Sequence, residues 1–447
     1  TILMDHLHGQ DVEYNTFISE SVLARTQITI KLDPEEKQSF NIKELEEKII
    51  SVTQSWEDEL EESLFESYGE ETANIYINKY RSAFSSGYRE EFSPRRAAID
   101  IEHIENVSNG QHLGMSFYRA LNESDEIVHF KLFHADQPVT LSDVMPIFEN
   151  MGFRVIGEHP YECIDREGRT VWIHDFTLTA SSHQIIDINK IRKSFESLFL
   201  KVWEGNAEND SFNRLVISAY MNWRQIAMLR SYARYMRQIR VSNSQRFIAN
   251  TVVSNTHISS LLIELFESRF NPSLDQSLAK IQCEKIEADF LLALDDVLNL
   301  SEDKILRLYL DLIKATMRSN YYQSNEEGDY RYDIAFKFHP RLIPNVPMPV
   351  PKYEIFIYSP RIEGVHLRGG KVARGGLRWS DRYEDYRTEV QQQLQQQAER
   401  FGTEVRIGMA TAVLFSKEVG GIHKVKIIVQ PTTYLQKTGS FDYLKWK

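Results

Sequence analysis

The stretch EGVHLRGGKVARGGLRWSDR, residues 363–382, combines two Gly-Gly pairs with a high density of arginine. Between Arg361 and Arg387 there are seven basic and four acidic side chains, in a chain whose net charge is -12. Glycine pairs let backbone N–H groups approach a ligand closely, and arginine offers a two-point fork to a carboxylate or phosphate. These residues predict a loop that binds a small anion, with Lys371, Arg374 and Arg378 as candidate ligands.

The bland alternative for the same stretch is a charged turn held by its own Arg–Asp pairs, with Asp381 and Asp385 as the acids. Composition favours neither interpretation. Other chemistry is absent from the sequence: it has no GxGxxG, HExxH, CxxC or GxSxG motif, and its histidines lack metal-ligand spacing. His129 and His134 flank an expected strand, and we expect both at the surface.

Composition places the chain among globular proteins. Its 447 residues are 42% hydrophobic, enough for about two to four packed domains. The acidic balance disfavours non-specific nucleic-acid binding, and neither a secretion signal nor an apolar run long enough to span a membrane is visible. Only Cys163 and Cys283 could form a disulfide, so we expect a reduced, cytoplasmic protein.

The first third of the chain predicts a mixture of helix and strand. A short alternating strand is expected from Thr26 to Leu32. Residues 41–71 carry eleven acidic side chains, and their apolar residues recur every three or four positions, as on one face of a helix: Leu45, Ile49, Val52, Trp56, Leu60 and Leu64. The acidic run is therefore expected on the solvated side of that helix.

Residues 127–180 predict a small α/β unit. Strands are expected at 127–135, 153–164 and 170–178, with the turn DREG between the last two, and a helix is expected at 142–151. Ser142 is the expected N-cap, Pro146 falls in the expected first turn, and Gly152 ends the helix. The order strand-helix-strand-strand is half of a ferredoxin-like unit, so we expect an antiparallel sheet with this helix on one face.

Residues 187–320 predict helices, and 341–352, with four prolines, predicts an extended linker and a domain boundary before a strand at 353–359. Within the helices, tyrosines interleave with five arginines: Arg224, Arg230, Arg234, Arg237 and Arg240. A nucleic-acid-binding helix could show this pattern. We favour internal ion pairs, because the surrounding sequence is acidic.

Several long motifs, in order, resemble the large bacterial NAD-specific glutamate dehydrogenases. YSPRIEGVHLRGGKVARGGLRWSDRYEDYRTEV, residues 358–390, resembles the start of their catalytic domain. LSDVMPIFENMGFRVIGEHPY and WIHDF resemble the preceding ACT-type module, and GNAENDSFNRLVISAYMNWRQIAMLRSYARYMRQ resembles the helical stretch between the two. SWEDELEESL and YREEFSPRRAAIDIEHIE also fit, so the likeness covers about residues 18–390.

The resemblance implies an α+β protein with ferredoxin-like ACT-type modules, a mostly helical middle and the start of an α/β catalytic domain. It implies five regions: an N-terminal α+β region at 1–126, an ACT-like module at 127–186, a helical region at 187–340, the catalytic start at 341–390 and an unassigned tail at 391–447. The family's carboxylate-binding basic-Gly-Gly motif falls on Arg374, Gly375 and Gly376. Glutamate or 2-oxoglutarate as substrate, NAD as cofactor, a homo-oligomer and an amino-acid effector are also implied.

The tail departs from the family pattern. After residue 390 the family continues with a lysine-bearing helix and a Lys-Gly-Gly motif, whereas this chain continues with the glutamine-rich run 391–397. Lys417 precedes a Gly-Gly pair, but at a different spacing. We therefore expect this chain alone to be catalytically inactive. The alternative function is an amino-acid-sensing and assembly module without catalysis, with residues 127–180 as the regulatory site.

Overall fold

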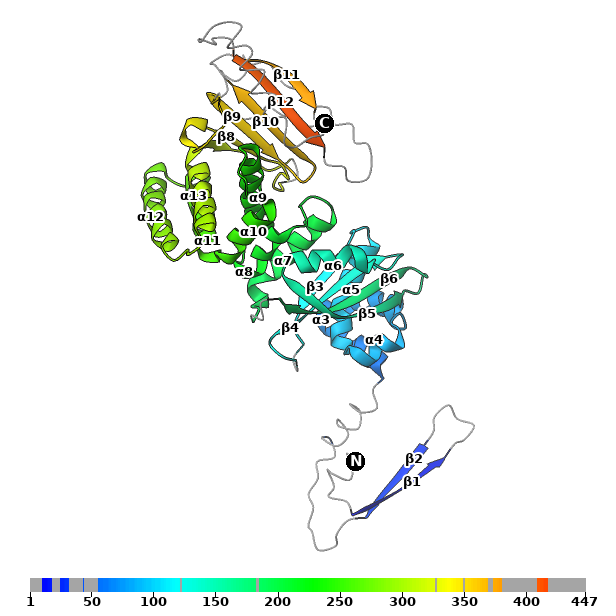
Figure 1. The fold of residues 1–447 in the computed structure, drawn as a ribbon. Coiled ribbons are helices and arrows are strands. Elements are labelled where there is room, and N and C mark those ends of the chain that lie inside the picture. The colour runs from blue at the N-terminus through cyan, green and yellow to red at the C-terminus, as the bar shows by residue number, and fades with distance from the viewer. Residues whose placement is uncertain are drawn as a thin grey trace. The chain divides into compact units, whose positions relative to one another are not determined.

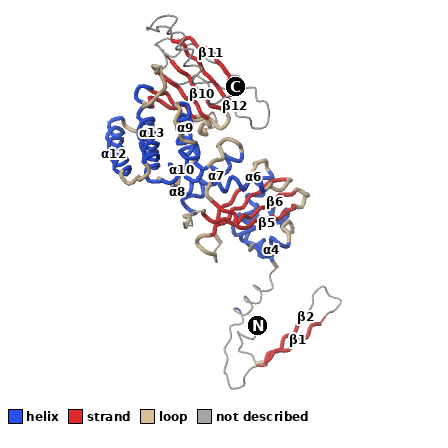
Figure 2. The backbone as a smooth tube through the Cα atoms, in the orientation of Figure 1, coloured by secondary structure: helices blue, strands red, loops and turns tan. Residues whose placement is uncertain are grey.

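A computed structural model describes residues 10–17, 25–31, 43, 55–120, 123–181, 185–325, 328–348, 350–368, 373–379 and 408–416 (Figures 1 and 2). The chain forms two compact units. The first contains residues 1–114, 132–138 and 159–174, and the second contains residues 115–131, 139–158 and 175–447. None of the helices in the described ranges is both long and apolar enough to cross a membrane.

The first unit begins with the antiparallel pair β1 (Asp11–Phe17) and β2 (Arg25–Lys31), which confirms the strand expected near residue 26. Its helices are α3 (Trp56–Tyr80), α4 (Ser86–Glu91) and α5 (Pro94–Ser108). Ser55 caps α3 in a reciprocal capping box with Asp58, and Leu60 and Leu64 are buried as the apolar spacing predicts. Residues 44–54, with Leu45, Ile49 and Val52, lie outside the described residues.

Aromatic rings fill the core of the first unit. The Tyr88 ring stacks on Phe84 at 4.6 Å between centroids and meets Tyr161 edge-on at 5.6 Å. The Tyr88 hydroxyl donates to the buried Asp100 carboxylate at 2.6 Å, so the phenol keeps a partner inside the core. Burial, with the Asp100 charge beside it, raises the pKa of Tyr88 well above its ordinary value.

A four-stranded sheet with the order β3-β4-β6-β5 follows. Its strands are β3 (Gly114–Tyr118), β4 (Ile127–Ala135), β5 (Phe153–Ile164) and β6 (Thr170–Ala180). The expected strands and the turn at 165–168 are confirmed. In a ferredoxin-like unit the edge position next to the first strand is filled by the last strand. Here β3, which precedes the predicted unit in the sequence, fills that position.

Helix α6 (Leu141–Asn150) corrects two details of the sequence prediction. Its N-cap is Thr140, not Ser142, and no side-chain hydrogen bond caps it. Pro146 therefore lies in the helix interior rather than the first turn. Gly152 does end the helix, with φ +91°, and a Cβ there would lie 2.8 Å from Ile217 Cδ1.

Phenylalanines hold two helices on one face of this sheet. The Phe130 ring of β4 lies 5.6 Å from Phe148 of α6, so the predicted packing of that helix on the sheet is confirmed. The same ring lies 5.2 Å from Phe195 and 5.1 Å from Phe199 of α7 (Ile188–Trp203). Phe130, Phe195 and Phe199 are all fully buried, so this contact is apolar throughout.

The middle of the chain is helical, as predicted, up to residue 315. After α7 come the short elements η1 (Ser211–Arg214) and α8 (Leu215–Ser218), then α9 (Trp223–Gln238), α10 (Gln245–Ser254), α11 (Thr256–Phe270), α12 (Gln276–Leu294) and α13 (Leu300–Ala315). On α11 the apolar residues from Ile258 to Phe266 form a buried stripe, because they face the neighbouring helices.

A second sheet, of six strands in the order β11-β12-β10-β9-β8-β7, follows the helices. Its first strands are β7 (Thr316–Ser319), β8 (Ile334–Phe338) and β9 (Tyr353–Tyr358), and its last are β10 (Ile362–Arg368), β11 (Ala373–Trp379) and β12 (Gly408–Ser416). The four-proline segment, with η2 (Pro340–Leu342), connects β8 to β9, which are paired antiparallel neighbours.

Candidate functional site

Four predicted anion-binding residues lie in a strand rather than a loop. Arg374, Gly375, Gly376 and Arg378 belong to β11, which runs parallel to β12 with Arg374 opposite Met409 and Gly376 opposite Thr411. The loop prediction was wrong here, because the glycines take part in strand pairing. Lys371 lies outside the described residues. The anion-binding roles themselves stay predictions.

Two strands from β11, on the far side of β12, Glu363 of β10 is a fully buried carboxylate. It stands opposite Tyr358 of β9 and Phe415 of β12, in the centre of the sheet. Two arginines of α9 face it: Arg237 Nη2 lies 3.4 Å and Arg234 Nε lies 3.7 Å from its carboxylate oxygens. An ionised group at this depth is stable only with such partners.

The α9 arginines form a row, because Arg230, Arg234 and Arg237 are four and three residues apart and share one face of the helix. Arg230 donates from Nε to Asp210 at 2.9 Å and from Nη2 to Asn213 at 2.6 Å. Arg234 also pairs with Glu208. Three acidic residues thus pair with the three arginines. The row of arginines connects the 208–213 segment to the centre of the six-stranded sheet.

Burial and charge act against each other along this row. Burial disfavours the guanidinium of Arg230, but Asp210 outweighs it and raises the pKa of Arg230 above its ordinary value. Burial also raises the pKa of Glu363, and Arg234 and Arg237 offset only part of that effect. The charge on Glu363 therefore depends on these two arginines.

Arg224, at the start of α9, has a different setting. Its guanidinium donates to the backbone carbonyl of Tyr321 at 3.0 Å and to that of Arg331, and it lies over the Tyr321 ring. Burial lowers the pKa of Arg224 to about 10. The predicted internal ion pairs are confirmed for Arg230, Arg234 and Arg237. Arg224 is also held by internal partners, but these are backbone carbonyls and a ring rather than acids.

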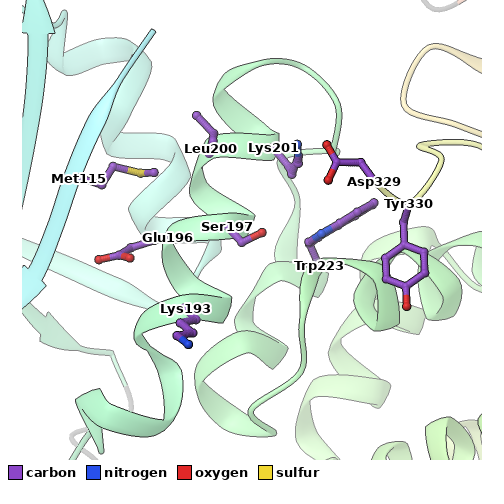
Figure 3. Close-up of a pocket in the computed structure, with 9 residues that line it drawn as sticks. All are labelled: Met115, Lys193, Glu196, Ser197, Leu200, Lys201, Trp223, Asp329 and Tyr330. Atoms are coloured by element: carbon purple, nitrogen blue, oxygen red, sulfur yellow. The ribbon is translucent and has the colours of Figure 1, made fainter. Parts of the chain in front are cut away.

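Two adjoining pockets border α7. The larger, of about 390 Å³, is lined by one face of α7 together with residues from β3, α9 and the segment before β8 (Figure 3): Met115, Lys193, Glu196, Ser197, Leu200, Lys201, Trp223, Asp329 and Tyr330. The smaller, of about 310 Å³, shares Lys193, Ser197, Trp223 and Tyr330 with it and adds Tyr321 and Glu267. Both lie outside residues 127–180, where the sequence placed a regulatory site.

Glu196 is a half-buried acid of the larger pocket. Its Oε1 accepts a hydrogen bond from the backbone N–H of Phe117, on edge strand β3, at 3.1 Å. Burial raises the pKa of Glu196, although this hydrogen bond and Arg192 act in the opposite direction. Across the pocket, Lys201 contacts the Tyr332 hydroxyl at 3.2 Å. The pocket therefore offers groups of both charges beside aromatic rings.

His129 lies inside the protein, so its expected surface position was wrong. Its Nδ1 lies 3.1 Å from Asp175 Oδ2 and its Nε2 lies 2.5 Å from Glu123 Oε2. Burial disfavours the charged imidazole, but Asp175 and Glu123 outweigh it and raise the pKa of His129. His134 is half-buried, with Nδ1 2.8 Å from the carbonyl of Gln137. Both cysteines are buried free thiols.

Sequence reasoning missed Glu363 and the pocket beside α7. A signal for Glu363 existed: an acid at the start of a strand, with arginines at helical spacing upstream. The pocket left no comparable signal, because its residues come from segments more than 200 positions apart. Among the residues that the structure describes, no group of three His, Cys, Asp or Glu side chains could hold a metal ion.

Family models of bacterial glutamate dehydrogenases match most of the chain. They are the ACT2 domain at residues 1–57, helical motif 2 at 63–107, the ACT3 domain at 112–191, helical motif 3 at 207–272 and the bacterial NAD-glutamate dehydrogenase catalytic domain at 289–421. The last match extends the likeness from residue 390 to residue 421 and includes β12, so the first part of the tail, which was expected to depart from the family, does fit it.

Curated relatives agree with these matches, and each is named NAD-specific glutamate dehydrogenase. The relative from Halomonas elongata is 47% identical over 87% of this chain, that from Pseudomonas aeruginosa 46% over 87%, and that from Mycobacterium tuberculosis 31% over 91%. The chain spans 24%, 24% and 26% of their respective lengths. With ACT, helical-motif and catalytic-domain matches in one order, the chain belongs to the family of bacterial NAD-glutamate dehydrogenases.

Proposed function

We propose that this chain is part of an NAD-dependent glutamate dehydrogenase, which converts L-glutamate to 2-oxoglutarate and ammonia in the cytoplasm. Within that enzyme the chain supplies a binding site for one substrate carboxylate. The observation that carries the proposal is the placement of Arg374-Gly375-Gly376 in β11, inside the segment that matches the catalytic domain.

The chemistry assigned to each residue follows from its type. The Arg374 guanidinium stays charged at any working pH and can grip a carboxylate with two hydrogen bonds. Gly375 and Gly376 have no side chain to keep a ligand from the backbone, and Lys371 and Arg378 add positive charge. NAD, when bound to the whole enzyme, takes up the hydride. The general base is expected outside this chain, so the chain alone is expected to have no turnover.

Substitution of Arg374 in the whole enzyme tests this assignment. Arg374→Ala should raise the KM for glutamate strongly and leave the KM for NAD nearly unchanged, because the charged fork contacts only the substrate. The KM for glutamate of Arg374→Lys should lie between those of the wild type and Arg374→Ala, because lysine keeps the positive charge but cannot form two parallel hydrogen bonds. Arg341→Ala, at an exposed arginine of η2, is the matched control. A glutamate KM unaltered in Arg374→Ala would reduce the β11 segment to a charged strand.

A second candidate function is the sensing of an amino-acid effector in a homo-oligomer. The pocket of about 390 Å³ supports it, because Lys193 and Glu196 could meet the carboxylate and the ammonium of an amino acid while Trp223 meets its side chain. Thermal shift assays with the individual amino acids would test it. A ligand that raises the Tm should lose its effect in Lys193→Ala and keep it in Lys190→Ala, a lysine one turn earlier on the exposed side of α7.

A further inference from the structure

The smaller pocket beside α7 has two unlike walls. On one wall, α7 contributes Lys193, Ser194 and Ser197, whose side chains carry hydrogen-bond donors. The other wall is aromatic and comes from the start of α9 and the segment between β7 and β8: Trp223, Tyr321, Tyr322 and Tyr330. Figure 3 shows Lys193 and Ser197 on α7, and Trp223 and Tyr330 across the space from them. The volume of about 310 Å³ is at the small end for ligand pockets, so a compact ligand fits it.

The pocket also contains a buried cation that no acid neutralises. Arg224 lines it and is 2% exposed, and within the described part of the chain its guanidinium donates hydrogen bonds to the backbone carbonyls of Tyr321 and Arg331 alone. Asp333 attracts Arg224 from beyond ion-pair distance, but this acid pairs with Arg331 at 3.1 Å. A buried charge without an opposite charge beside it is costly, and a bound anion would reduce that cost.

Two further sources of positive potential meet at the same pocket. Helix α9 begins at Trp223, and its N-cap Asn222 lines the pocket, so the positive end of the helix dipole lies there. Lys193 makes no hydrogen bond or ion pair with any residue that the structure describes. Of the described residues that line the pocket, only Glu267 is acidic, and its Oε1 accepts a hydrogen bond from Gln225 at 3.0 Å. The pocket is therefore positive, in a chain whose net charge is -12.

The aromatic wall restricts the ligand further. Aromatic rings can attract a cation, but Arg224 already takes that place: its guanidinium lies within 5.8 Å of the ring centroids of Trp223, Tyr321 and Tyr330. A second cation beside these rings would be repelled by Arg224. A neutral planar ring would instead pack against them by stacking or edge-on contact. The two walls together favour a ligand with a negative head and an aromatic body.

We propose that the smaller pocket binds a small aromatic carboxylate, whose carboxylate lies between Lys193 and the start of α9 and whose ring packs against Trp223 and Tyr330. This assignment goes beyond both functions proposed above. It uses neither Arg374 nor Glu196, which lines only the larger pocket, and it requires no ammonium on the ligand.

Isothermal titration of the 447-residue chain with three matched compounds tests the ligand class. Phenylacetate should bind with a Kd below about 1 mM, because it carries both the ring and the carboxylate. 2-Phenylethylamine carries the same ring on a cation and should not bind. Cyclohexylacetate keeps the carboxylate but has no planar face, and should bind about tenfold more weakly than phenylacetate. No binding of phenylacetate, or equal binding of phenylacetate and either other compound, would overturn the proposal.

Two substitutions test the position of the ligand. Lys193→Ala should raise the Kd for phenylacetate about tenfold, because it removes the cation that pairs with the carboxylate, and Lys190→Ala, one turn earlier on α7, should leave the Kd unchanged. Tyr330→Leu should raise the Kd about fivefold by removing a ring from the aromatic wall. Tyr220→Leu is its control, because Tyr220 is 49% exposed and Tyr330 45%, so neither change should unfold the chain. A Kd unaltered in Lys193→Ala or in Tyr330→Leu would overturn the site.

Glu196→Gln separates this site from that of the amino-acid effector. Glu196 would meet the ammonium of an amino acid, so its substitution should abolish any Tm shift caused by amino acids. The same substitution should leave the Kd for phenylacetate unchanged, because Glu196 does not line the smaller pocket. If no amino acid shifts the Tm, the effector function fails while phenylacetate binding still stands. A loss of phenylacetate binding in Glu196→Gln would overturn the separate assignment of the smaller pocket.

Discussion

The four-stranded and the six-stranded sheet each receive a helix, but the contacts differ in kind. Around Phe130, helix α7 meets the four-stranded sheet through phenylalanine rings, and a single hydrogen bond from the Phe117 backbone to Glu196 joins the two at the sheet edge. Helix α9 meets the six-stranded sheet partly through rings, with Tyr232 stacked on Phe336 at 4.2 Å, and partly through the buried pairing of Arg234 and Arg237 with Glu363.

The two kinds of contact have different consequences: the apolar contact mainly stabilises the fold, and the ionic contact mainly fixes the orientation of the helix on the sheet. Apolar contact is roughly proportional to buried area and tolerates small shifts of a helix on a sheet. A buried ion pair contributes little net stability, but losing one partner is costly, so the pair holds two elements in one relative position. The α7 contact is therefore expected to stabilise the ACT-type module, and the α9 contact to fix the helical region against the strand next to β12.

The largest effect is expected in the apolar contact. Phe130→Ala removes a fully buried ring that touches Phe148, Phe195 and Phe199, and should lower the free energy of unfolding by about 4 kcal/mol. Urea unfolding followed by circular dichroism measures it. Phe130→Leu, which keeps most of the volume, should cost less than half as much. An equal loss in the two variants would contradict an apolar packing role.

The ionic contact predicts non-additive losses instead. Glu363→Met leaves two arginines without their shared acid and should cost about 3 kcal/mol. Arg237→Met should cost less, because Glu363 keeps Arg234. In the double variant, Arg234 still pairs with Glu208. The double variant should therefore lose less free energy of unfolding than the sum of the two single variants, by about 2 kcal/mol. Additive losses from urea unfolding would mean that Glu363 and Arg237 act separately.

Arg230 sharpens the ionic side of the comparison. Its side chain is only 1% exposed, and its fork serves Asp210 and Asn213 together. Arg230→Lys keeps the charge but cannot reach both partners, so we expect a loss of about 2 kcal/mol in the free energy of unfolding. Arg307→Lys is the control, because Arg307 pairs with Asp303 on the surface and should change stability by less than about 0.5 kcal/mol.

How far the sequence predicted these regions depended on the range of the interactions involved. The strand at 127–135 and the helix near 142–151 follow from local patterns, and the structure confirms them. The predicted start of α6 was wrong by one or two residues. Ser142 and Thr140 are both acceptable N-caps, and only the tertiary structure decides between them.

The errors at functional positions have a different physical cause. Glycine-rich, basic segments look like loops because glycine weakens a strand, yet pairing with β12 overrides that preference in β11. His129 looks exposed because histidine is polar. Its partners, Asp175 and Glu123, are 46 and six residues away and cannot be read from local spacing. Long-range pairing decides both cases.

The smallest expected effect on the free energy of unfolding concerns His129. This residue belongs to a cluster of charged side chains on the four-stranded sheet. Besides Asp175 and Glu123, its ring stacks on Tyr118 at 5.1 Å, and Tyr118 in turn donates to Asp175 at 2.9 Å. The ammonium of buried Lys131 lies 5.6 Å from the Tyr118 ring, so the cluster contains two acids and two groups that can be cationic.

Because the pKa of His129 is raised above its ordinary value of 6.5, the folded chain binds a proton that the unfolded chain releases. The stabilisation is complete below pH 6.5 and is lost as the pH rises through the higher pKa of the folded state. Between pH 6 and pH 8.5 the wild-type chain should therefore lose about 1 kcal/mol more unfolding free energy than His129→Gln, an amount typical of one hydrogen bond. Asp175→Asn should reduce the same difference, because it removes the acid that favours the imidazolium most. Urea unfolding of the three chains at both pH values measures it, and parallel pH profiles for wild type and His129→Gln would show that His129 stays neutral in this sheet.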